Sequence, residues 1–175
     1  AKEHYQQVDA VLTQHAEGDP NLSRMGTTMT LAYSLGADLM VVHVGDSRAY
    51  LHRGNELRQL THDHTVAQGL VDQGKLTRKQ AAIHRLRHVL TAALGRTGGE
   101  VRVDVNRHSI ADGDCLLLCS DGLTDMVKDA QISEILGRGR PAGETCQTLI
   151  DLALENGGKD NVTAIVARYR IPESP

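Results

Sequence analysis

Short apolar segments that follow one another with little chain between them are the feature that most restricts how this sequence can fold. The four segments lie at residues 27–35, 39–44, 48–52 and 56–60. The first alternates and is rich in Thr and aliphatic residues, the second is a continuous apolar run with one His, and the other two flank the turn Arg53-Gly54-Asn55. Gly36 and Gly54 supply tight turns within the two pairs. Because a parallel connection needs a crossover of about a dozen or more residues, these pairs are predicted to be antiparallel hairpins.

Further strands and helices surround the two hairpins. Strand-like sequence returns at residues 101–109, 115–120 and 162–169, and helix-like sequence occurs at residues 2–16, 129–136 and 142–155. Hairpins combined with helices favour an α+β layered architecture, with helices outside antiparallel strands, over a doubly wound parallel sheet. At 175 residues, the chain is expected to form a single domain over residues 1–175.

Residues 62–96 are polar and rich in His, unlike the strands on either side. Short helices are expected at residues 66–73 and 77–82, separated by Gly74. We interpret residues 62–96 as an inserted surface subdomain. Its histidines could be proposed as a transition-metal cluster, but they lack zinc-type spacing with Cys, so surface histidines are the favoured interpretation. These histidines are His62, His64, His84 and His88.

Composition argues against two classes of partner. The 19 Lys and Arg residues and 22 Asp and Glu residues give a net charge of -3 without a basic stripe, so no nucleic-acid partner is expected. No apolar stretch approaches the ~20 residues of a membrane span, so no membrane partner is expected. Three cysteines without a CxxC pair are typical of reduced thiols, which predicts a cytoplasmic protein.

Three aspartates stand directly beside apolar strands. Asp46 follows the second expected strand, Asp121 follows the apolar run before it, and Asp160 precedes the last strand. Each one alone could simply cap a turn. Carboxylates gathered at strand ends repel one another unless a cation neutralises them or their pKa values rise. Oxygen donors without paired His or Cys point to Mg²⁺ or Mn²⁺.

Five short motifs occur together with these aspartates. They are Met25-Gly26-Thr27-Thr28, Gly45-Asp46-Ser47-Arg48, Leu60-Thr61-His62-Asp63-His64, Ser120-Asp121-Gly122-Leu123-Thr124-Asp125 and Asp160-Asn161-Val162-Thr163. In this order and approximate spacing, the motifs resemble those of the metal-dependent protein phosphatases, the PPM or type 2C family. The resemblance runs from about Met25 to Arg168. Residues 62–96 look like the flap of the bacterial members.

The resemblance implies a fold and an activity. The fold is an α-β-β-α sandwich of antiparallel sheets flanked by helices. The activity is hydrolysis of phosphoserine and phosphothreonine in proteins, so the implied partners are phosphorylated substrates of a Ser/Thr kinase in bacterial signalling. The implied cofactors are two Mn²⁺ or Mg²⁺ ions that activate a water without a covalent enzyme intermediate, with a weaker third ion beside them.

The same resemblance assigns roles to individual residues. Asp121 and Asp160 would be ligands of the binuclear centre and would act through its metal-bound water. Asp46 and Asp125, together with Asp121, would form the weaker third metal site. Two further residues are implied to lie beside the ligands and support them: Gly122 and Asn161.

One part of the family's pattern is missing from the sequence. The family carries Asp-Gly-Met-Gly-Gly or Asp-Gly-His-Gly-Gly near its N-terminus, and that Asp bridges both metals. The Asp-Gly steps here are Asp112-Gly113 and Asp121-Gly122, and neither continues in this way. We therefore expect the chain as given to be a phosphatase domain incomplete at its N-terminal end, with open sheet edges that favour self-association. A catalytically inactive, phosphatase-like binding module is the alternative.

Overall fold

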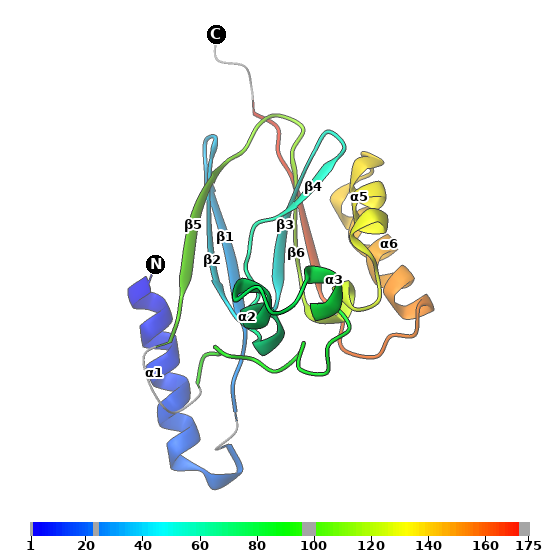
Figure 1. Ribbon diagram of the computed structural model, residues 1–175. Coiled ribbons are helices and arrows are strands. Elements are labelled where there is room, and N and C mark those ends of the chain that lie inside the picture. Colours follow the sequence, from blue (N-terminus) through cyan, green and yellow to red (C-terminus); the bar gives the residue numbers. More distant parts are fainter. Residues whose placement is uncertain (1, 23–24, 96–100, 172–175) are drawn as a thin grey trace. The chain divides into compact units, whose positions relative to one another are not determined.

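The computed structural model shown in Figure 1 describes residues 2–22, 25–95 and 101–171. Within these ranges the chain forms two compact units. The first takes in the described residues of 1–31, 42–46 and 62–105, and the second those of 32–41, 47–61 and 106–175. The expected flap of residues 62–96 ends one residue beyond the described part, at Arg96, and its residues 62–95 belong to the first unit.

The strands of the described residues form two sheets. They are β1 (Met29–Leu35), β2 (Asp38–Val44), β3 (Arg48–Arg53), β4 (Glu56–Gln59), β5 (Asp104–Ser109), β6 (Cys115–Cys119) and β7 (Ala164–Arg168). One sheet has three strands in the order β1-β2-β5, and the other has four strands in the order β4-β3-β6-β7. Consecutive strands β1 and β2 are neighbours, as are β3 and β4, which agrees with the two predicted hairpins.

Helices make up most of the remaining regular structure in the described residues. They are α1 (Lys2–Gly18), the 3-10 helix η1 (Pro20–Leu22), α2 (Val66–Asp72), α3 (Arg78–Ala81), α4 (Asp121–Thr124), α5 (Asp129–Gly137) and α6 (Ala142–Glu155). None of these helices is both long enough and apolar enough to cross a membrane. The short helix α4 has no counterpart in the sequence prediction, because four residues that include Gly122 carry no helical periodicity.

The four-stranded sheet of the second unit is antiparallel throughout. β3 pairs with β4 and with β6, and β6 pairs with β7, so that Tyr50 stands opposite Leu117 and Leu117 opposite Val166. Successive side chains of a strand point to opposite faces. Tyr50 and Leu117 therefore share one face of the sheet, and Leu51 lies on the other.

Each face of this sheet is covered by a different layer of the second unit. Tyr50 and Leu117 belong to a core cluster that includes Leu149 of α6 and further side chains of α4 and α5. Figure 1 shows α5 and α6 beside the sheet. Leu51 belongs to a second cluster, which includes Leu39 of β2. The layers of helices and antiparallel strands confirm the predicted α+β fold, and both cores are largely aliphatic because the sequence has no Phe or Trp.

The first unit holds α1 and the two short helices of the 62–95 segment. The Tyr5 side chain of α1 is buried, and its hydroxyl donates a hydrogen bond to the Val42 carbonyl at 3.2 Å. Helix α2 begins at Thr65, whose hydroxyl accepts a hydrogen bond from the Gln68 N–H at 3.2 Å. Helix α3 begins at Thr77 with a capping box. Threonine caps of this kind let short helices start in polar sequence.

Candidate metal centre

The end of strand β6 leads directly into helix α4, and this junction carries Asp121. Ser120 is the residue before the helix, and its hydroxyl is engaged by the loop before β7. The hydroxyl donates to the Asn161 carbonyl at 3.1 Å and accepts from the Thr163 N–H at 3.0 Å. The Ser120 N–H also donates to the Thr163 carbonyl at 3.1 Å. The loop that contains Asp160 is therefore tied to the start of α4.

Gly122 allows the loop to come this close to the helix. A Cβ atom at Gly122 would lie 3.5 Å from the Asp160 carbonyl carbon, 3.1 Å from that of Asn161, and closer still to the Asn161 carbonyl oxygen. The requirement for Gly is one of space, because its φ is not in the left-handed region. The backbone carbonyl groups of Asn161 and Asp160 thus pack against the first turn of α4, where Asp121 also stands.

Three aspartates of the second unit stand on the two segments that meet at this contact. Asp121 is the first residue of α4 and is half-buried, whereas Asp125 and Asp160 are exposed. The Asp125 N–H donates to the Asp121 carbonyl at 2.9 Å, which places Asp125 one helical turn further on. The Asp160 carboxylate accepts a hydrogen bond from the N–H of Asn161 at 2.7 Å, which orients it.

The side chains on these two segments are of the chemical type that suits a hard divalent cation. They offer carboxylate oxygens, which are the ligands that Mg²⁺ and Mn²⁺ prefer. The carboxylates come from two segments that are distant in sequence but held together by the hydrogen bonds of Ser120. Their partial exposure also gives a cation access from solvent.

Asp46 belongs to the first unit, where it follows the turn after β2. The preceding residue, Gly45, has a φ of 110°, and a Cβ atom there would lie 3.1 Å from the Thr28 Cα and closer still to its side chain. Both the backbone conformation and the space therefore require Gly at this position. Gly45 therefore determines the path of the backbone after β2, and with it the position of Asp46.

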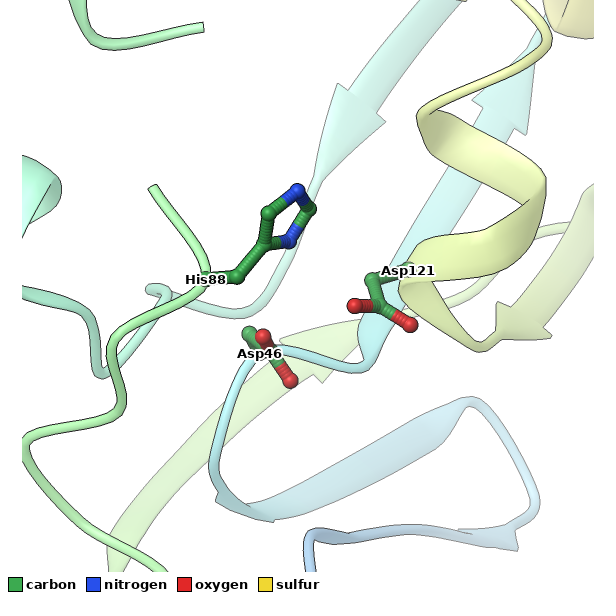
Figure 2. Close-up of side chains that lie close together, drawn as sticks. All are labelled: Asp46, His88 and Asp121. Carbon is green, nitrogen blue, oxygen red and sulfur yellow. The ribbon is translucent and has the colours of Figure 1, made fainter. Parts of the chain in front are cut away.

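His88, which the sequence favoured as a surface histidine rather than a metal ligand, is a neighbour of Asp46. Figure 2 shows the two side chains close together, and each offers a ligand atom within 4.8 Å of the other's. His88 lies in the polar 62–95 segment and is exposed. No sequence spacing links it to Asp46, so only the fold reveals this proximity. Asp121, the third residue labelled in Figure 2, belongs to the second unit.

A buried polar network lies behind Asp46 in the first unit. His43 and His64 are 0% and 1% exposed, with ring centroids 5.0 Å apart. The expectation that His64 is a surface histidine is wrong, because its ring is hydrogen-bonded to the Gly45 N–H at 3.2 Å and to the Asp104 carboxylate at 3.1 Å. The polar sequence around His64 gave no indication of its burial, which is possible because partners distant in sequence satisfy both ring nitrogens.

Two pKa values in this network are shifted. The pKa of His43 is lowered to about 4, mainly by burial and to a smaller extent by the neighbouring His64 ring. For Asp104, burial raises the pKa, but hydrogen bonds from His64 and Arg102 outweigh it and leave the pKa below its ordinary value. His43 is therefore neutral and Asp104 ionised at neutral pH.

Comparison with known proteins extends this description. The family model for protein phosphatase 2C matches residues 1–69. The chain is 44% identical over 159 residues to the serine/threonine protein phosphatase PstP of Mycobacterium tuberculosis, a match that covers 91% of this chain and 30% of PstP. The chain thus spans less than a third of the length of that relative.

Solved structures give the same result. The crystal structure of the Mycobacterium tuberculosis serine/threonine phosphatase PstP/Ppp matches with a TM-score of 0.85 and 42% identity, over 93% of this chain and 68% of that one. A structure of the PstP catalytic domain in complex with two manganese ions matches with a TM-score of 0.80 and 41% identity, over 90% and 65% of the two chains. The family depends on Mn²⁺ or Mg²⁺. This chain belongs to the protein phosphatase 2C family, the metal-dependent PPM phosphatases, in its bacterial form.

Proposed function

We propose that this chain forms the greater part of the catalytic domain of a protein phosphatase that hydrolyses phosphoserine and phosphothreonine in proteins. The observation that carries the proposal is the packing of the Asn161 and Asp160 carbonyl groups against Gly122 at the start of α4. This contact brings the segments of two family carboxylates together in a chain whose relatives are serine/threonine phosphatases. The substrates would be phosphorylated proteins, the products of a Ser/Thr kinase.

The metal ligands in this proposal are the four aspartates of the sequence motifs. Asp121 and Asp160 would hold the pair of Mn²⁺ or Mg²⁺ ions, and Asp46 and Asp125 would join Asp121 around a weaker third ion. When bound, such ions neutralise the charge of the phosphoryl group and lower the pKa of the attacking water. Support comes from the oxygen donors of these residues and from family membership.

The chain's own residues would position these ligands. The Asn161 N–H orients the Asp160 carboxylate through its hydrogen bond of 2.7 Å. Ser120 and Gly122 keep the peptide backbone around Asp160 and Asn161 against α4. Both supports act on the backbone of the loop, one through the Ser120 hydroxyl and the other through the lack of a side chain at Gly122.

The cell compartment, the domain organisation and the self-association of the protein are also proposals. We place the protein in the cytoplasm, on the ground that Cys115, Cys119 and Cys146 are free thiols. The interpretation of residues 62–96 as a flap within a single domain of residues 1–175 remains a prediction. Self-association through the outer strands of the sheets remains a prediction as well.

The test compares two chains on a phosphothreonine peptide with Mn²⁺. One is the chain of 175 residues, and the other carries an added upstream segment with the family's Asp-Gly-Met-Gly-Gly motif. We expect weak Mn²⁺ binding and slow turnover from the first and full turnover from the second, because the bridging carboxylate is supplied only there. Equal turnover by both would refute the role of the bridging Asp.

Two substitutions in the extended chain separate the metal sites. Asp121→Asn should reduce kcat far more than Asp125→Asn, because Asp121 would touch the catalytic pair of ions and Asp125 only the accessory ion. Equal losses would contradict these assignments. The absence of the bridging motif from the sequence favours a second candidate, the inactive phosphatase-like binding module. No turnover by either chain, combined with retained binding of the phosphopeptide, would establish it.

A further inference from the structure

We propose that His64, oriented by Asp104, is a positioning residue that holds the Gly45–Asp46 turn in place through its unprotonated Nδ1 atom. The inference deepens the proposed function, since it rests on Asp46 being a metal ligand. All the residues that carry it belong to the first unit. The geometry assigns His64 a task that neither its motif nor its polar sequence surroundings indicate.

The hydrogen bonds of Gly45 determine which tautomer of His64 is present. The Gly45 N–H lies 3.2 Å from the His64 Nδ1, and a backbone N–H can only donate. Nδ1 must therefore accept, which leaves the proton of the neutral ring on Nε2. Nε2 faces the Asp104 carboxylate at 3.1 Å, an acceptor that matches this proton. The Asp104 contact thus selects the tautomer that Gly45 needs.

Asp104 is itself held in place. The Arg102 guanidinium donates to the two Asp104 carboxylate oxygens at 3.2 Å and 3.4 Å. The His64 side chain is fully buried, whereas Asp104 is 21% and Arg102 is 61% exposed. A relay of hydrogen bonds therefore runs from the surface at Arg102 to the backbone of the Asp46 turn.

The carbonyl of Gly45 is held as firmly as its N–H. The carbonyl accepts from the His64 backbone N–H at 2.7 Å and from the His43 Nε2 at 2.9 Å. The other ring nitrogen of His43 accepts from the Thr30 hydroxyl at 2.9 Å. His43 and His64 together therefore satisfy both backbone groups of Gly45.

Such support is needed because Gly45 occupies a conformation open to few residues. Its φ is 110°, its neighbour Thr28 leaves no room for a Cβ atom, and it is buried. A buried N–H without a partner is costly, so the turn keeps this form only while an acceptor faces it. Asp46 is the next residue, and the direction of its carboxylate follows from the Gly45 backbone.

Two isosteric substitutions separate the two ring nitrogens. In His64→Asn the amide oxygen takes the place of Nδ1, so the acceptor for Gly45 is kept and the Asp104 contact is lost. In His64→Gln the amide extends toward the place of Nε2, so the Asp104 contact is kept and the Gly45 acceptor is lost. We expect His64→Gln to weaken Mn²⁺ binding at Asp46 by about 10-fold or more, the range for residues that orient metal ligands. His64→Asn should retain most of the affinity.

The decisive measurement is a double-mutant cycle on the 175-residue chain, with Mn²⁺ binding followed by EPR titration. In an Asp46→Asn background, His64→Gln should weaken Mn²⁺ binding no further, since the ligand that it positions is already gone. A merely structural role would instead lower the affinity by the same factor in both backgrounds. That result, or a loss in His64→Asn as large as in His64→Gln, would overturn the inference.

A second readout is independent of metal and of phosphatase activity. ¹⁵N NMR of the metal-free chain should show His64 as the Nε2–H tautomer, and the Gly45 amide should resist hydrogen exchange in wild type and His64→Asn but not in His64→Gln. The Nδ1–H tautomer, or equal protection in all three proteins, would overturn the inference. If the wild-type chain binds no Mn²⁺, the metal-ligand role in the proposed function fails, and these NMR results alone decide whether His64 holds the turn.

Discussion

Replacing Gly122 by Ala tests directly whether the contact between α4 and the Asp160 loop builds the proposed metal centre. The added methyl group would lie 3.1 Å from the Asn161 carbonyl carbon and closer than 3.0 Å to its oxygen. Carbon atoms pack at about 3.5 to 4.0 Å from their neighbours, so the loop must withdraw by at least about 0.5 Å. The atoms that must move are backbone, which cannot change rotamer to make room.

The expected cost has two opposing contributions. Overpacking a tight contact costs about 1 to 3 kcal/mol, and replacing Gly by Ala within a helix returns about 0.5 to 1 kcal/mol. We therefore expect Gly122→Ala to lower the free energy of unfolding by up to about 2.5 kcal/mol. Moving the loop also separates Asp160 from Asp121, so Mn²⁺ affinity should fall by about 10-fold or more.

Gly143 provides the matched control. It also lies in a helix, α6, and a Cβ atom there would meet nothing within 4 Å. Gly143→Ala should raise the free energy of unfolding by about 0.5 to 1 kcal/mol and leave Mn²⁺ binding unchanged. Urea unfolding and Mn²⁺ titration of both variants measure these effects. If Gly122→Ala were as stable as Gly143→Ala and bound Mn²⁺ like wild type, the close contact would have no part in forming the site.

Two further predictions concern buried charges and pH. The pKa of His43 is lowered from 6.5 to about 4 in the folded state, so between these pH values the unfolded chain binds a proton that the folded chain does not. The free energy of unfolding should therefore be constant above pH 6.5 and fall by roughly 3 kcal/mol as the pH decreases toward 4. Urea unfolding at several pH values should show this loss in wild type but not in His43→Gln, and equal slopes would contradict it. Asp114, which is 1% exposed, accepts two hydrogen bonds from Arg53, at 2.8 Å and 2.6 Å. Since Arg53 is half-exposed, Asp114→Asn should cost about 2 kcal/mol at pH 7 in the same assay, and an unchanged midpoint would show that the pair contributes nothing.

Local sequence pattern was sufficient for most strands. The hairpins around Gly36 and Gly54 were predictable because turn chemistry and alternation act over a few residues. Element ends were less certain: the strand expected over residues 101–109 begins at Asp104, and the one expected over 162–169 is limited to Ala164–Arg168. The strand-like sequence extends beyond the residues that pair with a neighbouring strand. The sequence of one segment alone does not show where that pairing begins and ends.

The motifs predicted which residues to examine but not how they are supported. The motif after the apolar run pointed to Asp121 as a ligand and to Gly122 as its support, yet nothing in the sequence showed why residue 122 must be Gly. The reason is the carbonyl of Asn161, and Ser120 bonds to that same carbonyl across 41 residues of chain. The proximity of His88 to Asp46 was likewise invisible, because no spacing rule joins the two residues.

The sequence by itself determined the α+β class, the antiparallel hairpins and the identity of the candidate metal ligands. These depend on turn residues, on apolar periodicity and on motifs, all of which are local. Only the tertiary structure decided that His64 is buried, which of its nitrogens faces Gly45, and that Gly122 meets the Asp160 loop. Burial and hydrogen bonding depend on partners distant along the chain, and polar residues such as His64 enter a core only when folding supplies those partners.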